Sequence, residues 1–303
     1  MATPTHTRTV ALGGGRVMTV DDLGDPDGSP IVYLHGTPDS RLARHPDDHL
    51  AAAAGVRLLA VDRPGYGGTS PAAGGWSADW PAAVAADVAT ALDAFGVDRC
   101  AVLAWSGGAL TGLAVAATAP RAERVAALGI VAGLVPRQAY DDPEVCAAGE
   151  SRRGVIELAD VVPPGGLGDE IAPMVAPHPC DLALAAEHQA GHRDAVGTAE
   201  LAGVQGGPER MAAALVEAVR PGLAGVAADV EGEARPLAVD LAAIRCPVRL
   251  WYGTDDVVTP PAFGRWYATH LPHADLTVVD RAGHYLAFTA WSRMLNELAA
   301  LVT

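Results

Sequence analysis

A serine lies between small residues where an apolar segment meets a glycine pair. Residues 102–108 read VLAWSGG, so that Ala104 lies two positions before Ser106 and Gly108 two positions after it. This pattern approximates the G-x-S-x-G nucleophile elbow, a tight strand-to-helix turn that holds a serine hydroxyl at the carboxyl edge of a sheet. The turn also leaves the backbone amide of Gly107 at a helix N-terminus, where developing negative charge is stabilised. We therefore predict that Ser106 is a nucleophile and that Gly107 contributes to an oxyanion hole.

An aspartate pair and a histidine follow later apolar segments and could activate that serine. Residues 253–260 read GTDDVVTP, and either Asp255 or Asp256 could orient an imidazole. The G-x-x-D-x-x-x-P spacing favours Asp256. His284 follows the last predicted strand. In a Ser-His-Asp triad the imidazole takes the serine proton and the carboxylate orients the imidazole, so we predict that His284 and Asp256 act on Ser106.

A loop near the start of the chain could supply a second oxyanion donor. Residues 33–38 read YLHGTP, and Thr37 is the favoured donor because Pro38 has no backbone N–H. His35 is an alternative base, although a histidine–glycine pair at such a place more often shapes the loop. Three side chains near these motifs are candidates for lining the substrate pocket: His35, Trp105 and Tyr285.

The elements that must position these residues alternate between strands and helices. Short apolar runs bounded by turn residues predict strands at 8–12, 16–20, 31–34, 57–61, 101–104, 125–131, 248–252 and 276–280. Helical spacing and capping residues predict helices at 42–54, 77–95, 107–119, 261–270 and 284–301. This alternation predicts an α/β fold with a mostly parallel central sheet flanked by helices. The reactive residues then fall at strand ends, where open α/β sheets place their sites.

The alternation stops near Pro136 and resumes after Asp240. Between them the chain is rich in proline and glycine and has only short helical patterns, such as residues 209–220. We predict a helical insertion at 136–240 within a core made of residues 1–135 and 241–303. The insertion holds 18 acidic residues and 7 arginines, which is −11 of the total −15. We expect much of this charge to face the substrate entrance and disfavour anionic substrates; alternatively, the acids lie on the outer surface.

The composition excludes several classes of protein. With 50% hydrophobic and 19% charged residues, the 303-residue chain can bury a sizeable core. The net charge is −15 and all 21 basic residues are arginine, so a basic surface for nucleic acid or membrane lipid is not expected, nor is Schiff-base chemistry on lysine. The first 17 residues lack the apolar segment of a signal peptide, which predicts a cytoplasmic protein. Widely spaced thiols agree with a reducing compartment: Cys100, Cys146, Cys180 and Cys246.

Taken together, the motifs resemble those of the α/β-hydrolase fold family. The order Ser106, Asp256, His284 is the order found in that fold, and residues 62–70, DRPGYGGTS, look like its D-R-x-G-x-G-x-S turn. The resemblance covers about residues 10–136 and 240–303, with the insertion in the position of the family's helical cap, or lid. It implies the catalytic and oxyanion roles given above. Serine at the elbow argues against the relatives that use an aspartate nucleophile, and alanine in place of the first glycine is a departure from the pattern.

The resemblance implies a serine hydrolase that cleaves a small ester, lactone or related carbonyl substrate through an acyl-enzyme on Ser106. A Ser-His-Asp triad with an oxyanion hole requires no metal and no cofactor. Alternatives with the same fold and triad are carbon–carbon bond hydrolysis, perhydrolysis, or a lyase or cyclase step, because fold does not fix function. A non-catalytic ligand-binding protein is a further alternative. The expected partner is a small-molecule substrate, with no nucleic acid and no membrane.

Overall fold

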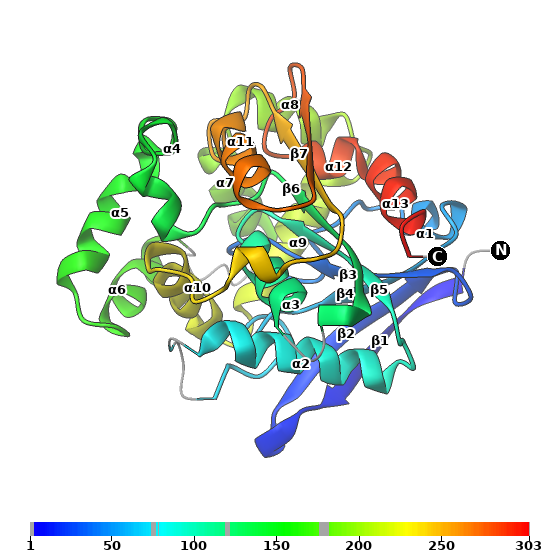
Figure 1. Ribbon diagram of the computed structural model, residues 1–303. Helices are drawn as coiled ribbons and strands as arrows, with labels where there is room; N and C mark the ends of the chain where they lie inside the picture. The colour runs from blue at the N-terminus through cyan, green and yellow to red at the C-terminus, as the bar shows by residue number, and fades with distance from the viewer. Residues whose placement is uncertain (1–2, 74–76, 78, 119–121, 176–181, 303) are drawn as a thin grey trace.

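The computed structural model describes residues 3–73, 77, 79–118, 122–175 and 182–302. Within them, an eight-stranded sheet carries helices on both faces, and a run of helices is inserted between strands β6 and β7 (Figure 1). The chain therefore has the α/β architecture that the alternation of patterns predicts.

The strand order of the sheet is β1-β2-β4-β3-β5-β6-β7-β8. The pairs β1–β2 and β2–β4 are antiparallel, and the other neighbours are parallel. All eight predicted strands are present: β1 (Thr3–Ala11), β2 (Val17–Gly24), β3 (Ser29–Leu34), β4 (Val56–Val61), β5 (Cys100–Trp105), β6 (Val125–Val131), β7 (Val248–Gly253) and β8 (Ala274–Val279). Because β4, β3 and β5–β8 run parallel, the loops that follow them meet at one edge of the sheet.

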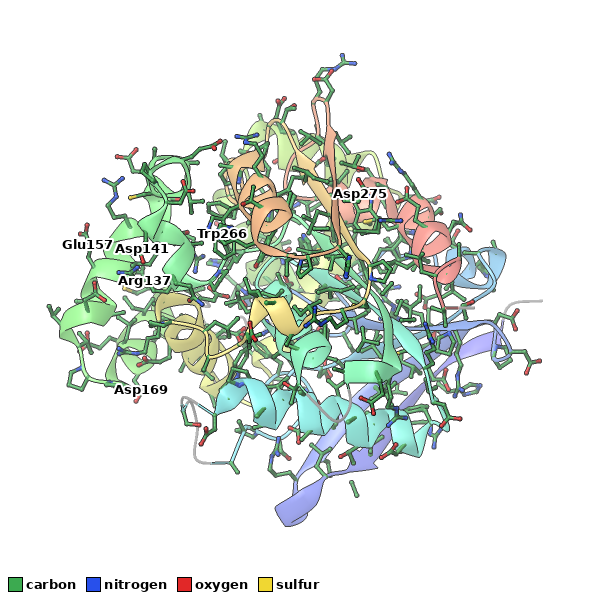
Figure 2. All side chains as sticks on the ribbon, viewed as in Figure 1. Arg137, Asp141, Glu157, Asp169, Trp266 and Asp275 are labelled. Carbon is green, nitrogen blue, oxygen red and sulfur yellow. The ribbon has the colours of Figure 1, made fainter. Side chains whose placement is uncertain are left out.

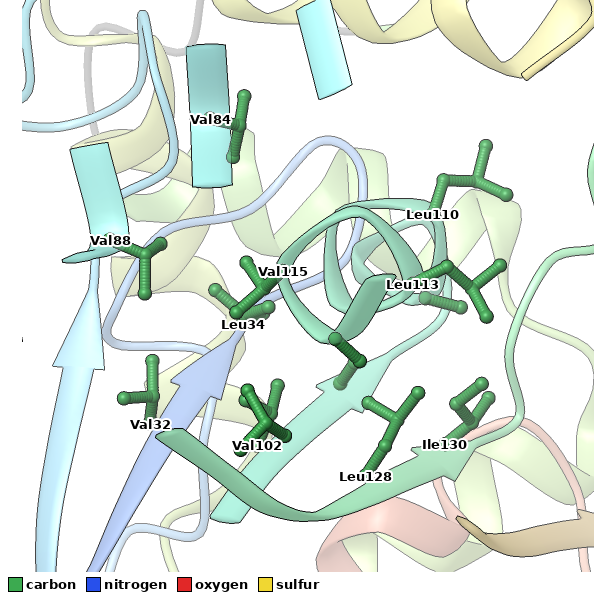
Figure 3. Packing of buried hydrophobic residues seen from close by; sticks show 14 of the residues in the cluster. Val32, Leu34, Val84, Val88, Val102, Leu110, Leu113, Val115, Leu128 and Ile130 are labelled. Carbon is green, nitrogen blue, oxygen red and sulfur yellow. The ribbon is translucent and has the colours of Figure 1, made fainter. Parts of the chain in front are cut away.

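The central strands are apolar on both faces because helices cover both. On β3, Val32 and Leu34 belong to one hydrophobic cluster, whereas Ile31 and Tyr33 belong to another on the opposite face. Figure 3 shows Val32 and Leu34 beneath helices α2 and α3. Side chains alternate between the two faces of a strand, so a strand covered on both sides reads as a continuous apolar run.

The helices around the sheet differ from the predicted ones mainly at their ends. Predicted helix 42–54 is wrong in length, because only its last turn is α-helical and Pro46 interrupts the segment before it. Predicted helix 284–301 is two short helices. The elements are η1 (Gly13–Gly15), α1 (His49–Ala53), α2 (Trp80–Ala94), α3 (Gly108–Ala117), η2 (Ala122–Arg124), α11 (Pro261–His270), α12 (Leu286–Thr289) and α13 (Trp291–Ala299). The predicted end of the helix at residues 107–119 includes Ala119, which lies outside the described residues.

The segment between β6 and β7 consists, in its described residues, of helices joined by turns and loops, without a strand. We refer to residues 136–240 as the inserted segment. Its elements are η3 (Arg137–Asp141), α4 (Pro143–Ala148), α5 (Glu150–Val161), α6 (Gly166–Val175), α7 (Leu182–His192), α8 (Ala195–Ala202), α9 (Gly207–Val219) and α10 (Ala224–Ala234), and η4 (Leu241–Ala243) follows it. Helices α5, α6, α7, α9 and α10 form a hydrophobic cluster of their own, into which Tyr66 of the β4–α2 loop is packed.

No single helix in the described residues is both long and apolar enough to cross a membrane. Helices α9 and α10 pass that test of length and composition only as a pair, and they are bent by 97° relative to each other.

Candidate active site

Ser106 lies at the turn between β5 and α3, at the carboxyl edge of the sheet. Its φ is 54°, in the left-handed region that residues other than glycine rarely adopt. A Cβ atom at Gly108 would lie 2.5 Å from the carbonyl oxygen of Leu34, so only glycine fits there. The elbow pattern has glycine at the position of Ala104. The methyl group of Ala104 fits there because it faces Gly112 of α3, which has no side chain. A Cβ atom added to Gly112 would lie only 3.0 Å from that methyl group. The small residues around Ser106 are therefore steric requirements of this turn.

His284 lies within hydrogen-bonding distance of both Ser106 and Asp256. Its Nε2 atom is 3.0 Å from Ser106 Oγ, and its Nδ1 atom is 3.0 Å from Asp256 Oδ2. The loops after β5, β7 and β8 thus bring together the three residues that the sequence motifs select. Thr259 was not anticipated: its hydroxyl donates to Asp256 Oδ2 at 2.6 Å and its amide donates to Oδ1 at 2.8 Å. A carboxylate held at both oxygens keeps a single orientation toward the imidazole.

The surroundings of this group favour an ionised Asp256 and a basic His284. Burial alone would raise the pKa of Asp256, but the charge of His284 and hydrogen bonds from His284 and Thr259 outweigh it and lower that pKa. Burial alone would lower the pKa of His284, but the Asp256 carboxylate outweighs it, so the pKa lies above the usual value near 6.5. An imidazole of raised basicity is better able to accept a proton from a serine hydroxyl.

Asp255, the alternative acid, points elsewhere. Its side chain is exposed, and its Oδ1 accepts a hydrogen bond from the Thr254 hydroxyl at 2.9 Å. Asp256, by contrast, is 3% exposed and is the residue that contacts His284. The geometry therefore agrees with the spacing argument that favours Asp256.

Two candidate oxyanion donors, the backbone amides of Thr37 and Gly107, belong to residues in contact near Ser106. A Cβ atom at Gly107 would meet the hydroxyl of Thr37, which shows that the two residues are in close contact. No hydrogen bond within the described residues uses the amide of Thr37 or of Gly107. Gly107 immediately precedes helix α3, so the partial positive charge of the helix N-terminus adds to its amide. Neither amide therefore has an acceptor among the described residues, and both remain candidates for binding an oxyanion.

Trp105 and Tyr285 line the cavity in front of Ser106, as expected of pocket residues. The indole Nε1 of Trp105 donates to the carbonyl oxygen of His284 at 3.1 Å. The rings of Trp105 and Tyr285 lie 5.7 Å apart, and both approach the His284 ring. These aromatic side chains pack against the imidazole and restrict its movement.

His35 is not among the residues that line this cavity. It is fully buried, its Nε2 accepts a hydrogen bond from the Arg63 amide at 3.0 Å, and its Nδ1 lies 2.8 Å from the carbonyl oxygen of Gly36. Burial and the nearby Arg63 charge hold the pKa of His35 well below its usual range. A neutral ring with both nitrogens in use supports the loop after β3 and is not free to act as a base.

A buried ion pair, missed in the sequence, connects the loop after β3, which carries Thr37, to the inserted segment. Arg63 makes two hydrogen bonds to Asp229 of α10, at 2.7 and 2.6 Å, and a third to the carbonyl oxygen of Gly36 at 2.7 Å. The hydroxyls of Thr37 and Tyr66 also donate to Asp229, each at 2.6 Å. The D-R-x-G-x-G-x-S turn therefore does more than join two elements in sequence. Its Arg63 also holds α10 against the loop that carries Thr37.

Glu200 of helix α8 makes a second connection between the inserted segment and the site. One carboxylate oxygen accepts from the amide of Gly283 at 2.8 Å, and the other accepts from the amide of Tyr285 at 2.9 Å. These two residues flank His284, so Glu200 fixes the backbone on both sides of the imidazole. Nothing local in the sequence marks Glu200, which lies more than 80 positions from the loop it holds.

The cavity in front of Ser106 has a volume of about 560 Å³ and a mostly apolar wall. The core contributes Ser106 and His284 to the wall, and the inserted segment contributes side chains such as Val155, Ile171, Met174 and Leu215. A more open hollow of about 670 Å³ lies between residues 45–47, α8 and α12, and none of the three triad candidates lines it. The volume and lining of the first cavity suit a small, largely apolar molecule.

The charge of the inserted segment is mostly directed away from this cavity. Figure 2 shows Asp141, Glu157 and Asp169 on helices at the left of the molecule, and all three are exposed. Among the described residues, only two acids of the segment line the cavity, Asp194 and Glu233, and the segment's Arg152 and Arg193 line it too. The expectation that much of the negative charge faces the entrance is therefore not supported, and the outer-surface alternative is favoured.

No group of three histidine, cysteine, aspartate or glutamate side chains within the described residues is arranged to hold a metal ion.

The chain belongs to the α/β hydrolase family. The sequence model of that family matches residues 31–301, which include all the loops that meet at Ser106. A solved α/β hydrolase fold protein from Nakamurella multipartita is 25% identical, covers 98% of this chain and 99% of its own, and superposes with a TM-score of 0.65. The 2-hydroxy-6-oxo-6-phenylhexa-2,4-dienoate hydrolase from Rhodococcus sp. strain RHA1 shares the fold at 16% identity, with 99% of each chain covered and a TM-score of 0.64.

A curated relative matches over a shorter stretch. The pimeloyl-[acyl-carrier protein] methyl ester esterase of Chromobacterium violaceum is 44% identical over 55 residues, which is 18% of this chain. The match spans a fifth of the length of that relative. It supports membership of the family and leaves the substrate of this chain open.

Proposed function

We propose that the protein is a serine hydrolase that cleaves small carboxylic esters or lactones through an acyl-enzyme on Ser106. The observation that carries the proposal is the continuous hydrogen-bonded series from Ser106 Oγ through His284 to Asp256. The amides of Thr37 and Gly107, which have no acceptor among the described residues, support it. This arrangement combines a nucleophile, a base, an orienting carboxylate and donors for an oxyanion.

In the proposed reaction, Ser106 Oγ attacks the substrate carbonyl carbon while His284 Nε2 takes the hydroxyl proton. The carbonyl oxygen becomes an oxyanion that accepts hydrogen bonds from the amides of Thr37 and Gly107. When the tetrahedral intermediate collapses, His284 returns the proton to the leaving alkoxide, and the acyl group stays on Ser106. Water, activated by His284, then attacks the acyl-enzyme and releases the acid.

We also propose that the inserted segment acts as a cap that shapes the acyl pocket. Its helices supply part of the apolar cavity wall, and Asp229 and Glu200 attach it to the oxyanion loop and the His284 loop. An apolar wall excludes water and strengthens the hydrogen bonds made at the oxyanion. A small neutral ester suits such a pocket better than a large charged one.

Covalent labelling tests the proposal directly. A fluorophosphonate probe is expected to add one phosphonyl group per chain, on the peptide that contains Ser106, as measured by intact-mass and peptide mass spectrometry. A panel of phenyl and methyl esters and lactones should then give acid products detectable by mass. Absence of labelling together with absence of hydrolysis would favour a ligand-binding protein on the same fold.

The pH dependence of hydrolysis is expected to follow His284. Burial alone would lower the pKa of this imidazole, but the carboxylate of Asp256 outweighs it and keeps the pKa above 6.5. Because only the neutral imidazole accepts the serine proton, kcat/KM should fall as pH decreases through a value above 6.5. Initial rates with a neutral ester from pH 5 to 9 measure this. An acid limb centred well below pH 6 would contradict the assignment of His284 as the base.

A further inference from the structure

Asp39 is a buried carboxyl group without a hydrogen-bond partner in the described part of the chain. It follows the oxyanion loop, is 6% exposed and lines the cavity in front of Ser106. Its Oδ1 atom is enclosed and unpaired, and no hydrogen bond between described residues uses Oδ2. Buried carboxyl groups are normally paired, because an unpaired one loses its hydration without compensation. An unpaired carboxyl group inside a cavity points to a ligand that supplies its missing hydrogen-bond partner.

The position of Asp39 places it beside the reacting centre. A Cβ atom added to Gly36 would lie 3.5 Å from Asp39 Oδ2 and also 3.5 Å from Ser106 Oγ. Because both oxygens lie at this distance from one point, they are separated by at most twice 3.5 Å. A short acyl group attached to Ser106 would have its first few carbons within reach of the Asp39 carboxyl.

The protonation state of Asp39 indicates which ligand group would suit it. Burial raises the pKa of Asp39 to about 8, although the charges of Arg63 and His284 act in the opposite direction. At pH 7 the carboxyl is then mostly neutral, so it can donate one hydrogen bond and accept another. A hydroxyl group has the same capacity and needs no counter-ion. An ammonium group would instead require Asp39 to ionise in a buried place.

We propose that Asp39 is a specificity-determining residue that hydrogen-bonds a hydroxyl group on the acyl part of the substrate. This inference rests on the proposed function, and it names hydroxyacyl esters as the preferred substrate class. A substrate without the hydroxyl leaves Asp39 unpaired in the complex, and sites built to pair a substrate hydroxyl discriminate strongly against analogues that lack it.

Three phenyl esters that differ at one position test the preference: butanoate, 3-hydroxybutanoate and 3-aminobutanoate. Release of phenol gives kcat/KM for each. The hydroxy ester is expected to be at least about tenfold better than the plain ester. A ratio near one would overturn the proposal, and a clear advantage of the amino ester over the hydroxy ester would overturn the assignment of a neutral donor.

Substitutions at Asp39 attribute the preference to this residue. D39L should reduce the ratio of hydroxy to plain ester toward one. D39N keeps a donor and an acceptor in the same shape and should retain a preference, which also guards against a misfolded leucine variant. The matched control is D27L in the exposed β2–β3 turn, which should keep the wild-type ratio. An unchanged ratio in D39L would show that another group recognises the hydroxyl.

Binding without turnover separates this inference from the proposed function. On S106A, ligand-observed NMR should show tighter binding of methyl 3-hydroxybutanoate than of methyl butanoate, and D39L in that background should remove the difference. A binding preference with no turnover by the wild type would support the Asp39 subsite and overturn the proposed hydrolysis. Turnover with no preference in either assay would overturn the subsite alone.

Discussion

Replacing Ser106 with alanine is expected to lower kcat for ester hydrolysis by about 10⁴- to 10⁶-fold, as when the nucleophile is removed from other triads. The Oγ atom that would form the acyl-enzyme lies 3.0 Å from His284 Nε2, and it has no substitute at that place in the turn. The substitution removes one hydroxyl and leaves Gly108 and the backbone of the elbow intact. Steady-state rates with a neutral phenyl ester measure the loss, and thermal unfolding should show that the variant remains folded.

The control for this prediction is Ser292→Ala, which removes a serine hydroxyl from an exposed position of α13. It should keep wild-type kcat and wild-type labelling by a fluorophosphonate. Turnover close to wild type in a folded Ser106→Ala variant would contradict the nucleophile assignment, and the remaining activity would then have to be traced to another group in the cavity.

Sequence reasoning could predict the parts of the site that short local motifs identify. Ser106 requires glycine two positions later because a side chain there would collide with the carbonyl oxygen of Leu34, and that constraint is visible as a short motif. His284 and Asp256 follow buried strands, and parallel strands bring such loops to one edge of a sheet. The positions of the central strands were also predictable, because strands covered on both faces are continuous apolar runs. The catalytic roles of these residues stay predictions.

The parts that sequence reasoning missed depend on contacts between distant segments. Asp229 meets Arg63 across 166 positions, and Glu200 meets Gly283 across 83. Each lies in a helix whose sequence looks like an ordinary amphipathic or small-residue pattern, so nothing local shows that its carboxylate faces the core. Asp39 differs, since it lies one residue after the oxyanion motif, and an acid in that place was a signal available in the sequence.

Helix lengths and the direction of surface charge were also beyond local patterns. Residues 42–54 have helical spacing, but Pro46 cannot donate a helical hydrogen bond, and Arg41 and Arg44 are drawn to Asp21 on β2 instead. The acidic count of the inserted segment predicted a negative cavity, whereas the fold turns most of those side chains outward. Net charge constrains solubility and long-range fields more than it constrains which side chains reach a pocket.

Replacing Asp256 with asparagine is expected to reduce kcat by about 10⁴-fold, the loss typical of a triad acid changed to its amide. The structure indicates how the amide would sit. Asp256 Oδ1 accepts the amides of Val258 and Thr259, both at 2.8 Å, so the carbonyl oxygen of asparagine would stay there. Its NH₂ group would then face Nδ1 of His284 and donate to it. The proton of the neutral imidazole would move to Nε2, which could no longer accept a proton from Ser106.

The neighbouring acid provides the matched control, because Asp255→Asn makes the same chemical change one position earlier. Asp255 is exposed and its Oδ1 accepts only from the Thr254 hydroxyl, so kcat should stay within about threefold of wild type, as for most surface substitutions. Both variants are measured with the same neutral ester, and proton NMR of His284 reports which ring nitrogen carries the proton. If Asp255→Asn were the damaging change, the acid of the triad would be Asp255. If both variants kept wild-type rates, His284 would not need a carboxylate, because Thr259, whose hydroxyl lies 3.1 Å from its Nδ1, would be sufficient to orient it.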